Sequence, residues 1–333
     1  MSRITTLEEL ESLVGKVPAH MELKIIDHID AIATQWVKAA NLIVLSLGSA
    51  GSVVVTLGGG PAGFLSNSHE QLVIPLNSLD HPEKLHVGQN VGTLIFIPGL
   101  LETLRVNGRV SSISISDAVI SVEECFGHCA KALIRSEFWS PNIACNSQLS
   151  KEKFIDLTRF LAFATSDGQG HCDLSPKGDP AGLMVQFIEN EICFADRPGN
   201  RRMDSFRNLV TQGTCEAILM VPGEVQVAHL KGSVYLSTDQ ERLTRFAVKG
   251  KSPTLLTCWS NYSLDIYQSE AIRKANLWPT QLAPDGLKPS SLFVAHIKLN
   301  KRKGVAAAIA RSAVSVPGVM ERSLREDYKK NLY

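Results

Sequence analysis

The sequence lacks a dominant charge and any long apolar run, and both absences limit what the protein can do. Its 333 residues carry 34 basic and 33 acidic side chains, which give a formal net charge of +1. No bulk electrostatic field therefore favours nucleic acid or an anionic membrane as a partner. Apolar stretches such as residues 40–47 are broken by Gly and Ser, well short of the roughly 20 residues that a membrane helix needs. Any anion site must be local.

The sequence also lacks paired cysteines and an export signal. Its seven cysteines are scattered and mostly embedded in apolar segments such as Ile192-Cys193-Phe194. This usage is typical of reduced, buried thiols in the cytosol. The N-terminal ten residues form an acidic amphipathic start, not a charged segment followed by an apolar core. We expect a soluble, cytoplasmic protein, and the 44% hydrophobic content is ample for about two domains.

What the sequence does contain is an internal repeat. The matching segments are residues 60–63 and 179–182, residues 92–99 and 216–223, and residues 132–139 and 271–278. Their order is the same in both halves, and the offset grows along the chain, as insertions in surface loops would produce. We predict two copies of one domain, residues 1–145 and 146–280, followed by a C-terminal extension over residues 281–333.

Each copy is predicted to be mainly β. Residues 160–165 and 171–175 flank an Asp167-Gly168 bend and form a hairpin signal. Short β-rich segments at residues 183–188, 191–195, 217–221 and 226–236 follow, which favours a small antiparallel barrel. Helices are expected at residues 123–138, 201–210, 264–276 and 319–330.

One candidate site combines residues 173–179 with residues 196–208. Ser175 and Lys177 are two residues apart on an extended segment, so their side chains point to one face. Arg197, Arg201, Arg202 and Ser205 surround a turn that leads into a helix, where free backbone N–H groups and cations favour a phosphate. The alternative is a solvated basic loop that caps the helix.

A second candidate site lies in residues 123–139. If this segment is helical, His128, Lys131, Arg135 and Trp139 share one face, which would meet a ligand or another subunit. The alternative is an ordinary amphipathic helix. Cys125, His128 and Cys129 lack a fourth ligand and the Cys-x-x-Cys pairs of zinc sites, so no metal is predicted. The glycine pattern at residues 58–63 has no following helix or acidic partner, which argues against a dinucleotide site.

These motifs resemble the pyridoxamine 5′-phosphate oxidase-like family of FMN-binding split barrels. The segments that carry the resemblance are residues 98–109, 128–139, 173–178 and 196–205, within a region from about residue 20 to residue 280. The resemblance implies two fused six-stranded antiparallel split barrels that form a pseudo-dimer. It implies that Ser175, Lys177, Arg197, Arg201, Arg202 and Ser205 hold the FMN phosphate and ribityl chain. Lys131, Arg135 and Trp139 would come from the other barrel.

Neither half carries the whole set of motifs. The first half has Thr56 and Gly58 where the second has Ser175 and Lys177, so its phosphate cradle is absent. The second half has Glu270 and Lys274 where the first has Lys131 and Arg135. We therefore predict one intact composite flavin site and one eroded site.

The predicted function is an FMN-dependent oxidoreductase that acts on a small molecule, with NAD(P)H or oxygen as the redox partner. His128 is the candidate acid or base, although a structural hydrogen bond explains it equally well. Arg105 and Arg109 are candidates for binding an anionic substrate or for lining the seam between the barrels. The alternatives are a non-catalytic flavin- or haem-binding protein and a deazaflavin enzyme. The chain is expected to be a monomeric pseudo-dimer or a homodimer. The C-terminal extension could cover the eroded cleft, mediate self-association or form a solvated helix.

Overall fold

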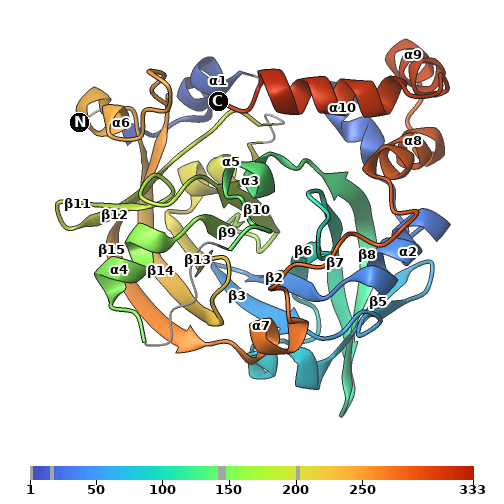
Figure 1. Ribbon diagram of the computed structural model, residues 1–333, viewed down its shortest axis with the longest axis horizontal. Helices are drawn as coiled ribbons and strands as arrows, with labels where there is room; N and C mark the ends of the chain where they lie inside the picture. The colour runs from blue at the N-terminus through green and yellow to red at the C-terminus, as the bar shows by residue number, and fades with distance from the viewer. Residues whose placement is uncertain (1–2, 16–18, 142–147, 200–202) are drawn as a thin grey trace.

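The computed structural model describes residues 3–15, 19–141, 148–199 and 203–333. Two antiparallel sheets form the body of the protein (Figure 1). The first contains β2 (Leu42–Ser49), β3 (Ser52–Gly59), β4 (Ser66–Asn67), β5 (Gln71–Pro75), β6 (Asn90–Phe96), β7 (Thr103–Ile113) and β8 (Asp117–His128). The second contains β9 (Phe160–Ser166), β10 (Cys172–Gly178), β11 (Gln186–Ile188), β12 (Glu191–Ala195), β13 (Thr214–Met220), β14 (Gln226–Ser237), β15 (Leu256–Gln268) and the N-terminal β1 (Arg3–Ile4).

Short helices connect and cover the strands. They are α1 (Leu7–Val14), α2 (Ala31–Ala39), α3 (Lys131–Arg135), α4 (Lys151–Leu157), α5 (Asp204–Thr211), α6 (Gln240–Thr244), α7 (Glu270–Ala275), α8 (Pro289–Leu299), α9 (Val305–Val314) and α10 (Val319–Lys330). Three 3-10 turns are η1 (Ala19–Lys24), η2 (Leu76–Ser78) and η3 (Pro82–Lys84).

The two sheets have the same topology. The first follows the order β3-β2-β6-β7-β8-β5-β4, and the second follows β10-β9-β13-β14-β15-β12-β11. Each strand of the first sheet thus has a counterpart seven strands later in the chain. The predicted fold class, two fused split barrels of mainly β structure, is confirmed. Each path has seven strands and not six, because the short β4 and β11 add to the ends.

Local sequence explains the hairpins. In the β2–β3 turn Gly51 adopts a φ of 77°, which a residue without a Cβ reaches at little cost. In the predicted β9–β10 hairpin the Asp167 carboxylate accepts hydrogen bonds from the backbone N–H groups of Gln169 and His171. This side chain replaces the strand partners that the bend residues lack.

Two of the predicted helices are wrong over most of their length. Residues 123–128 belong to β8 and residues 264–268 to β15, and helix begins only at Lys131 and Glu270. The long pairing of β7 with β8, and of β14 with β15, satisfies the backbone groups of these segments. The helical spacing of their charged residues is therefore incidental. By contrast, the predicted helix over residues 319–330 is confirmed as α10.

The two barrels share a hydrophobic core. Buried side chains of β2, β3 and β6 pack against those of β9, β10 and β13, among them Leu42, Phe96, Phe160 and Ile218. Helix α3 contacts β10, and α7 contacts β3. A Cβ added at Gly178 or at Gly59 would lie 1.9 Å from the carbonyl oxygen of Ala132 or Ala271, respectively. The same backbone-to-backbone approach therefore occurs twice, as expected for a pseudo-two-fold arrangement.

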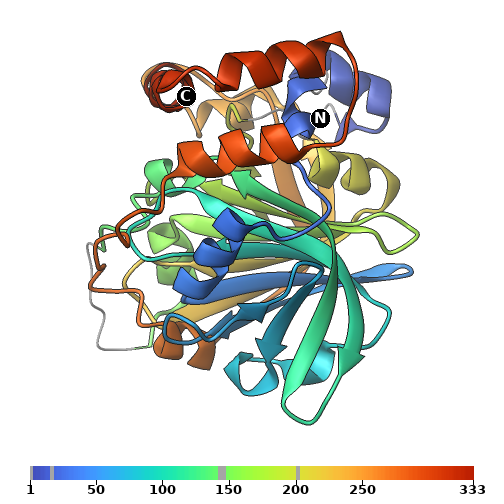
Figure 2. The same cartoon turned by 90° about the vertical axis from the view of Figure 1, so that its right-hand side faces the viewer.

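The ends of the chain pack differently from a simple tandem repeat. Strand β1 pairs with β14, and Leu10 of α1 is buried in the core of the second barrel. Residues 3–14 thus pack with the second barrel, although the predicted boundary groups them with the first. Helix α8 covers β8 and α2, and α10 crosses α8 and α9 to end near α1 (Figures 1 and 2). No helix in the described ranges is both long enough and apolar enough to span a bilayer.

Candidate functional site

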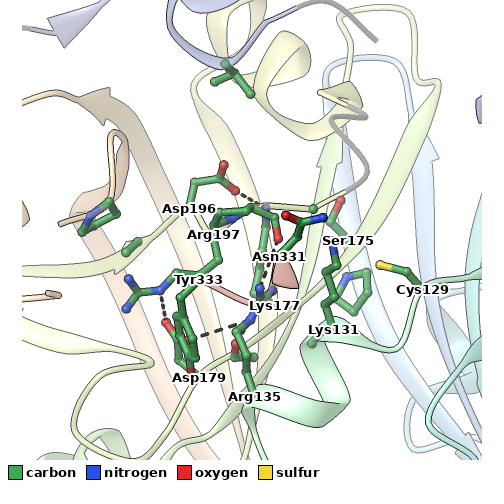
Figure 3. A pocket seen from close by; sticks show the side chains of 18 of the residues that line it. Cys129, Lys131, Arg135, Ser175, Lys177, Asp179, Asp196, Arg197, Asn331 and Tyr333 are labelled. Atoms are coloured by element: carbon green, nitrogen blue, oxygen red, sulfur yellow. Dashed lines mark hydrogen bonds and ion pairs between the residues drawn. The ribbon is translucent and has the colours of Figure 1, made fainter. Parts of the chain in front are cut away.

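A cavity of about 600 Å³ lies where the two halves and the C-terminal segment meet (Figure 3). Helix α3 of the first half forms one wall, and β10 with the loop after β12 forms the other. The loop of residues 251–254, the end of α1 and the residues around the end of α10 complete the lining. This volume is within the range of small-molecule sites.

The cavity brings together predicted site residues from both copies of the repeat. His128, Lys131 and Arg135 come from the first half, and Ser175, Lys177 and Arg197 come from the second. The close approach of Gly178 to Ala132 is what sets α3 directly against β10. Arg135 Nε accordingly donates to the Gly178 carbonyl oxygen at 2.9 Å.

Beneath the second-half wall lies a buried carboxylate, Asp173. It accepts hydrogen bonds from the hydroxyls of Ser175 (2.8 Å) and Ser205 (2.5 Å), and Arg105 Nη2 lies 2.8 Å from its other oxygen. Burial by itself would raise the pKa of Asp173, but Arg105 and the donated hydrogen bonds lower it below its ordinary value. Asp173 therefore fixes the side chain of Ser175 and joins the two halves.

A second buried carboxylate, Asp179, holds the arginines of the site. Arg197 Nε donates to it at 2.5 Å, and Arg135 Nε lies 4.0 Å away. The Tyr333 side chain lies near Asp179, where it acts to lower the pKa of that carboxyl, and its ring lies 5.6 Å from the Arg197 guanidinium. Burial raises the pKa of Asp179 against the opposing effect of the arginines. Figure 3 shows these groups converging on one side of the cavity.

The two lysines that the sequence predicted for the site are each paired with a carboxylate. Lys177 Nζ lies 3.1 Å from Asp196 and 4.5 Å from the centre of the Phe206 ring. Lys131 Nζ lies 2.9 Å from Asp327, which belongs to α10. Lys131 is only 4% exposed, so its ammonium group needs an acceptor inside the protein, which Asp327 supplies.

His128 lines the cavity as a neutral imidazole. Burial and the nearby charges of Lys24 and Arg105 hold the pKa of His128 well below its ordinary value. Its Nδ1 lies 3.4 Å from the carbonyl oxygen of Cys129. A neutral ring at this position can donate or accept a hydrogen bond, but it does not carry the proton of an imidazolium at neutral pH.

Other predicted residues lie away from the cavity wall. Arg105 is buried against Asp173, and Arg109 lies partly exposed beside Glu123, at 3.8 Å. The Trp139 indole N–H donates to the Leu100 carbonyl oxygen, and Ser205 reaches the site through Ser175 and Asp173. Arg201 and Arg202 lie outside the described residues.

Sequence reasoning missed three parts of the site. Asp173 and Asp179 flank the Ser-Pro-Lys motif at even spacing, which is a signal for the same strand face as Ser175 and Lys177. The third is the segment from Asp327 to Tyr333, which lines this cavity. No spacing in the sequence indicates that docking.

The charges that line the cavity favour an anionic ligand. Among its described lining residues are five cations and three carboxylates: Lys131, Arg135, Lys177, Arg197 and Lys251 against Asp179, Asp196 and Asp327. The excess of positive charge favours an anion. In addition, Nη2 of Arg197 is buried and has no hydrogen-bond partner among the residues that the structure describes. A buried donor of this kind is costly unless an acceptor reaches it.

The corresponding place in the other half is filled. A Cβ at Gly58, the counterpart of Lys177, would lie 2.8 Å from the side chain of Leu79 and 3.0 Å from that of Ile43. Asp80 accepts hydrogen bonds from the Ser269 hydroxyl and the Ala271 backbone N–H at the start of α7. Apolar side chains thus occupy the space beside Gly58, and the Asp80 carboxylate is engaged by the start of α7.

No protein-family model matches the chain, and no curated protein matches it. Among solved structures, HupZ of Group A Streptococcus is 12% identical over 36% of this chain and 95% of its own, with a TM-score of 0.29. An F420 reductase is 10% identical over 35% of this chain and 98% of its own (TM-score 0.25). General Stress Protein 26 from Bacillus anthracis is 12% identical over 35% of this chain and 90% of its own (TM-score 0.24).

Proposed function

We propose that this chain is an FMN-dependent oxidoreductase of the pyridoxamine 5′-phosphate oxidase-like class, with a single flavin site built from both halves. The observation that carries the proposal is the convergence of Lys131 and Arg135 with Ser175, Lys177 and Arg197 around one cavity with excess positive charge. Cofactors of this kind supply the reactive chemistry, here hydride transfer, while the protein supplies binding, orientation and electrostatics.

In this proposal the second half holds the phosphate and ribityl chain. Ser175, Lys177 and Arg197 would contact them directly, together with Arg201 and Arg202 from the adjoining segment. Ser205 acts through the hydroxyl of Ser175, 2.6 Å away, and through Asp173. Asp196 keeps the Lys177 ammonium at the cavity wall until an anion arrives.

The first half closes the opposite side. Lys131 and Arg135 would meet the flavin or an acidic substrate, and Trp139 supports α3 through its bond to Leu100. The neutral His128 is suited to accept or donate a hydrogen bond at the ring or substrate. Arg105 keeps the role of anchoring Asp173 and is not part of the substrate contact in this scheme.

The first test is a flavin titration with matched variants of the two pseudo-equivalent sites. Lys177→Met and Arg135→Gln should each weaken FMN binding at least about tenfold, because each removes a charged hydrogen-bond donor from the ligand. The control is Lys274→Met, since Lys274 is the counterpart of Arg135 and donates to the Asn77 carbonyl oxygen on the surface. We expect this control to bind FMN as the unmodified protein does.

Two further measurements belong to the same test: the number of FMN molecules bound per chain, and the affinity for riboflavin, which lacks the phosphate. We expect one FMN per chain by absorbance, and Lys177→Met should affect riboflavin much less than FMN. Two flavins per chain would contradict the single-site proposal. An unmodified protein that binds no flavin, or variants that lose flavin only because their melting temperature falls, would contradict the proposal as a whole.

A carrier without turnover is the second candidate function. It is favoured by the pairing of each cavity carboxylate with an internal cation and by the neutral state of His128, which leave no obvious proton donor. Steady-state oxidation of NAD(P)H, or oxygen consumption with FMN bound, distinguishes the two. Turnover well above that of free FMN supports the enzyme, and its absence supports the carrier.

A further inference from the structure

The segment from Asp327 to Tyr333 enters the cavity and bonds to the cations that the first half contributes. Asp327 lies 2.9 Å from Lys131, and the Leu332 carbonyl oxygen accepts from Arg135 Nη1 at 2.9 Å. Tyr333 contacts both Asp179 and Arg197. In Figure 3 Asn331 and Tyr333 point into the same space as Lys131, Arg135 and Lys177. The segment thus supplies Lys131 and Arg135 with hydrogen-bond acceptors, which an anionic ligand in the cavity would otherwise supply.

The two cations in these contacts, Lys131 and Arg135, are buried, whereas Asp327, the acceptor on α10, is partly exposed. Lys131 and Arg135 are 4% and 8% exposed, but the Asp327 side chain is 41% exposed. A buried cation gains more from an acceptor than a surface carboxylate loses on returning to water. An anion that enters the cavity can therefore replace Asp327 at modest cost.

Helix α10 is also held in a way that permits its release. None of its residues is fully buried, and two of its ion pairs, Arg325–Glu321 and Lys330–Glu326, lie within the helix itself. Its polar attachment near the cavity is through Asp327 and through Tyr328, whose hydroxyl donates to Glu102 and accepts from the Ala130 backbone N–H. Regions with little buried apolar area open at low free-energy cost.

We infer that residues 327–333 form a gate, whose Asp327 carboxylate and Leu332 carbonyl are an internal stand-in that an oxyanion-bearing ligand displaces from Lys131 and Arg135. This inference rests on the proposed function, because the ligand it names is the occupant of the same cavity. It adds that the resting protein is closed by its own carboxylate and carbonyl groups. Binding of a phosphate- or carboxylate-bearing ligand then opens the α10 end of the cavity.

The test compares Asp327→Asn with Glu326→Gln. Both variants remove one negative charge from the same turn of α10, but Glu326 pairs with Lys330 and not with a cavity residue. Asp327→Asn should tighten FMN binding by about fivefold, the size expected from losing a partly exposed competing ion pair. Glu326→Gln should leave the affinity unchanged. In a Lys131→Met background the Asp327→Asn effect should disappear.

Hydrogen exchange of residues 327–333 gives a readout independent of affinity. Saturation with FMN should raise exchange in this segment and leave the barrel strands unchanged. Weaker FMN binding by Asp327→Asn, equal binding by both variants, or unchanged exchange on saturation would overturn the gate.

Inorganic pyrophosphate separates failure of the gate from failure of the proposed function. If no form of the protein binds FMN, the flavin proposal is wrong, and the gate is then decided by pyrophosphate alone. Release of residues 327–333 by pyrophosphate supports a gate for another oxyanion. Exchange that pyrophosphate leaves unchanged overturns it.

Discussion

Single charged residues in this protein have roles set by burial more than by their sequence motif. Arg105 and Arg109 lie four residues apart on β7 and have the same chemistry. Arg105 is 2% exposed and bridges the halves through Asp173, whereas the Arg109 side chain is 44% exposed. Only the first can be important for stability, because a surface ion pair contributes little.

We predict that Arg105→Met destabilises the fold by about 3–5 kcal/mol, because it leaves the Asp173 carboxylate buried without its cation. Arg109→Met, the matched control, should change the free energy of unfolding by no more than about 0.5 kcal/mol. Denaturant unfolding of the three proteins measures both effects.

The pH dependence follows from the lowered pKa of Asp173. A carboxyl whose pKa is lower in the folded state stabilises the fold above its unfolded pKa of about 4, and this contribution is lost as the pH falls. The cost of Arg105→Met should therefore be largest at neutral pH and shrink as the pH approaches about 4, where protonation removes the unpaired charge. A cost independent of pH would contradict this assignment.

Part of the cavity wall could be predicted from residue types in the sequence, but the buried carboxylates behind that wall could not. The shared role of Ser175 and Lys177 could be predicted because strand alternation places both side chains on one face. The roles of Asp173 and Asp179 could not be predicted. A carboxylate beside a proposed phosphate site would repel the phosphate, and only the structure shows that each carboxylate is paired with a buried arginine.

At the scale of elements, the short helices α3 and α7 determine where the two halves meet. Both follow the last long strand of their barrel and pack on the other barrel at a glycine. Their existence was predicted, but their length was not. Charged residues spaced by three and four fit a helix, yet antiparallel pairing with β7, the preceding strand of the same hairpin, makes residues 117–128 a strand.

The glycines at these two contacts provide a paired prediction. Gly178→Ala and Gly59→Ala each place a Cβ against a backbone carbonyl oxygen, so each should cost about 1–3 kcal/mol of stability. Only Gly178→Ala moves α3 with Lys131 and Arg135, so only that variant should also weaken FMN binding. Thermal unfolding and flavin titration on both variants separate the two effects. Equal loss of flavin in both would contradict the assignment of the cavity to α3 and β10.

At the scale of the whole molecule, the duplication could be read directly from the sequence, because collinear matches require no knowledge of contacts. The packing of residues 3–14 on the second barrel could not be predicted from the sequence, and neither could the path of α10. Both are dockings of terminal segments onto surfaces assembled from distant residues. Such contacts leave no periodic signal in the segment itself.

We predict that the protein is a monomer of about 36.3 kDa in solution. The apolar faces by which one barrel would pair with a second copy are already buried between the two halves. Light scattering coupled to size-exclusion chromatography measures the mass directly. A stable mass twice this value would mean that the chain pairs through another surface.

The Gly58–Leu79 contact has an evolutionary consequence. In a homodimer every substitution is made twice, so a leucine that fills one cleft fills its symmetry mate as well and removes all binding. A gene that encodes both copies in one chain escapes this constraint. One site can then be filled by apolar side chains such as Leu79. The other can keep Lys177 and its cavity, so that it can still evolve to bind a new ligand.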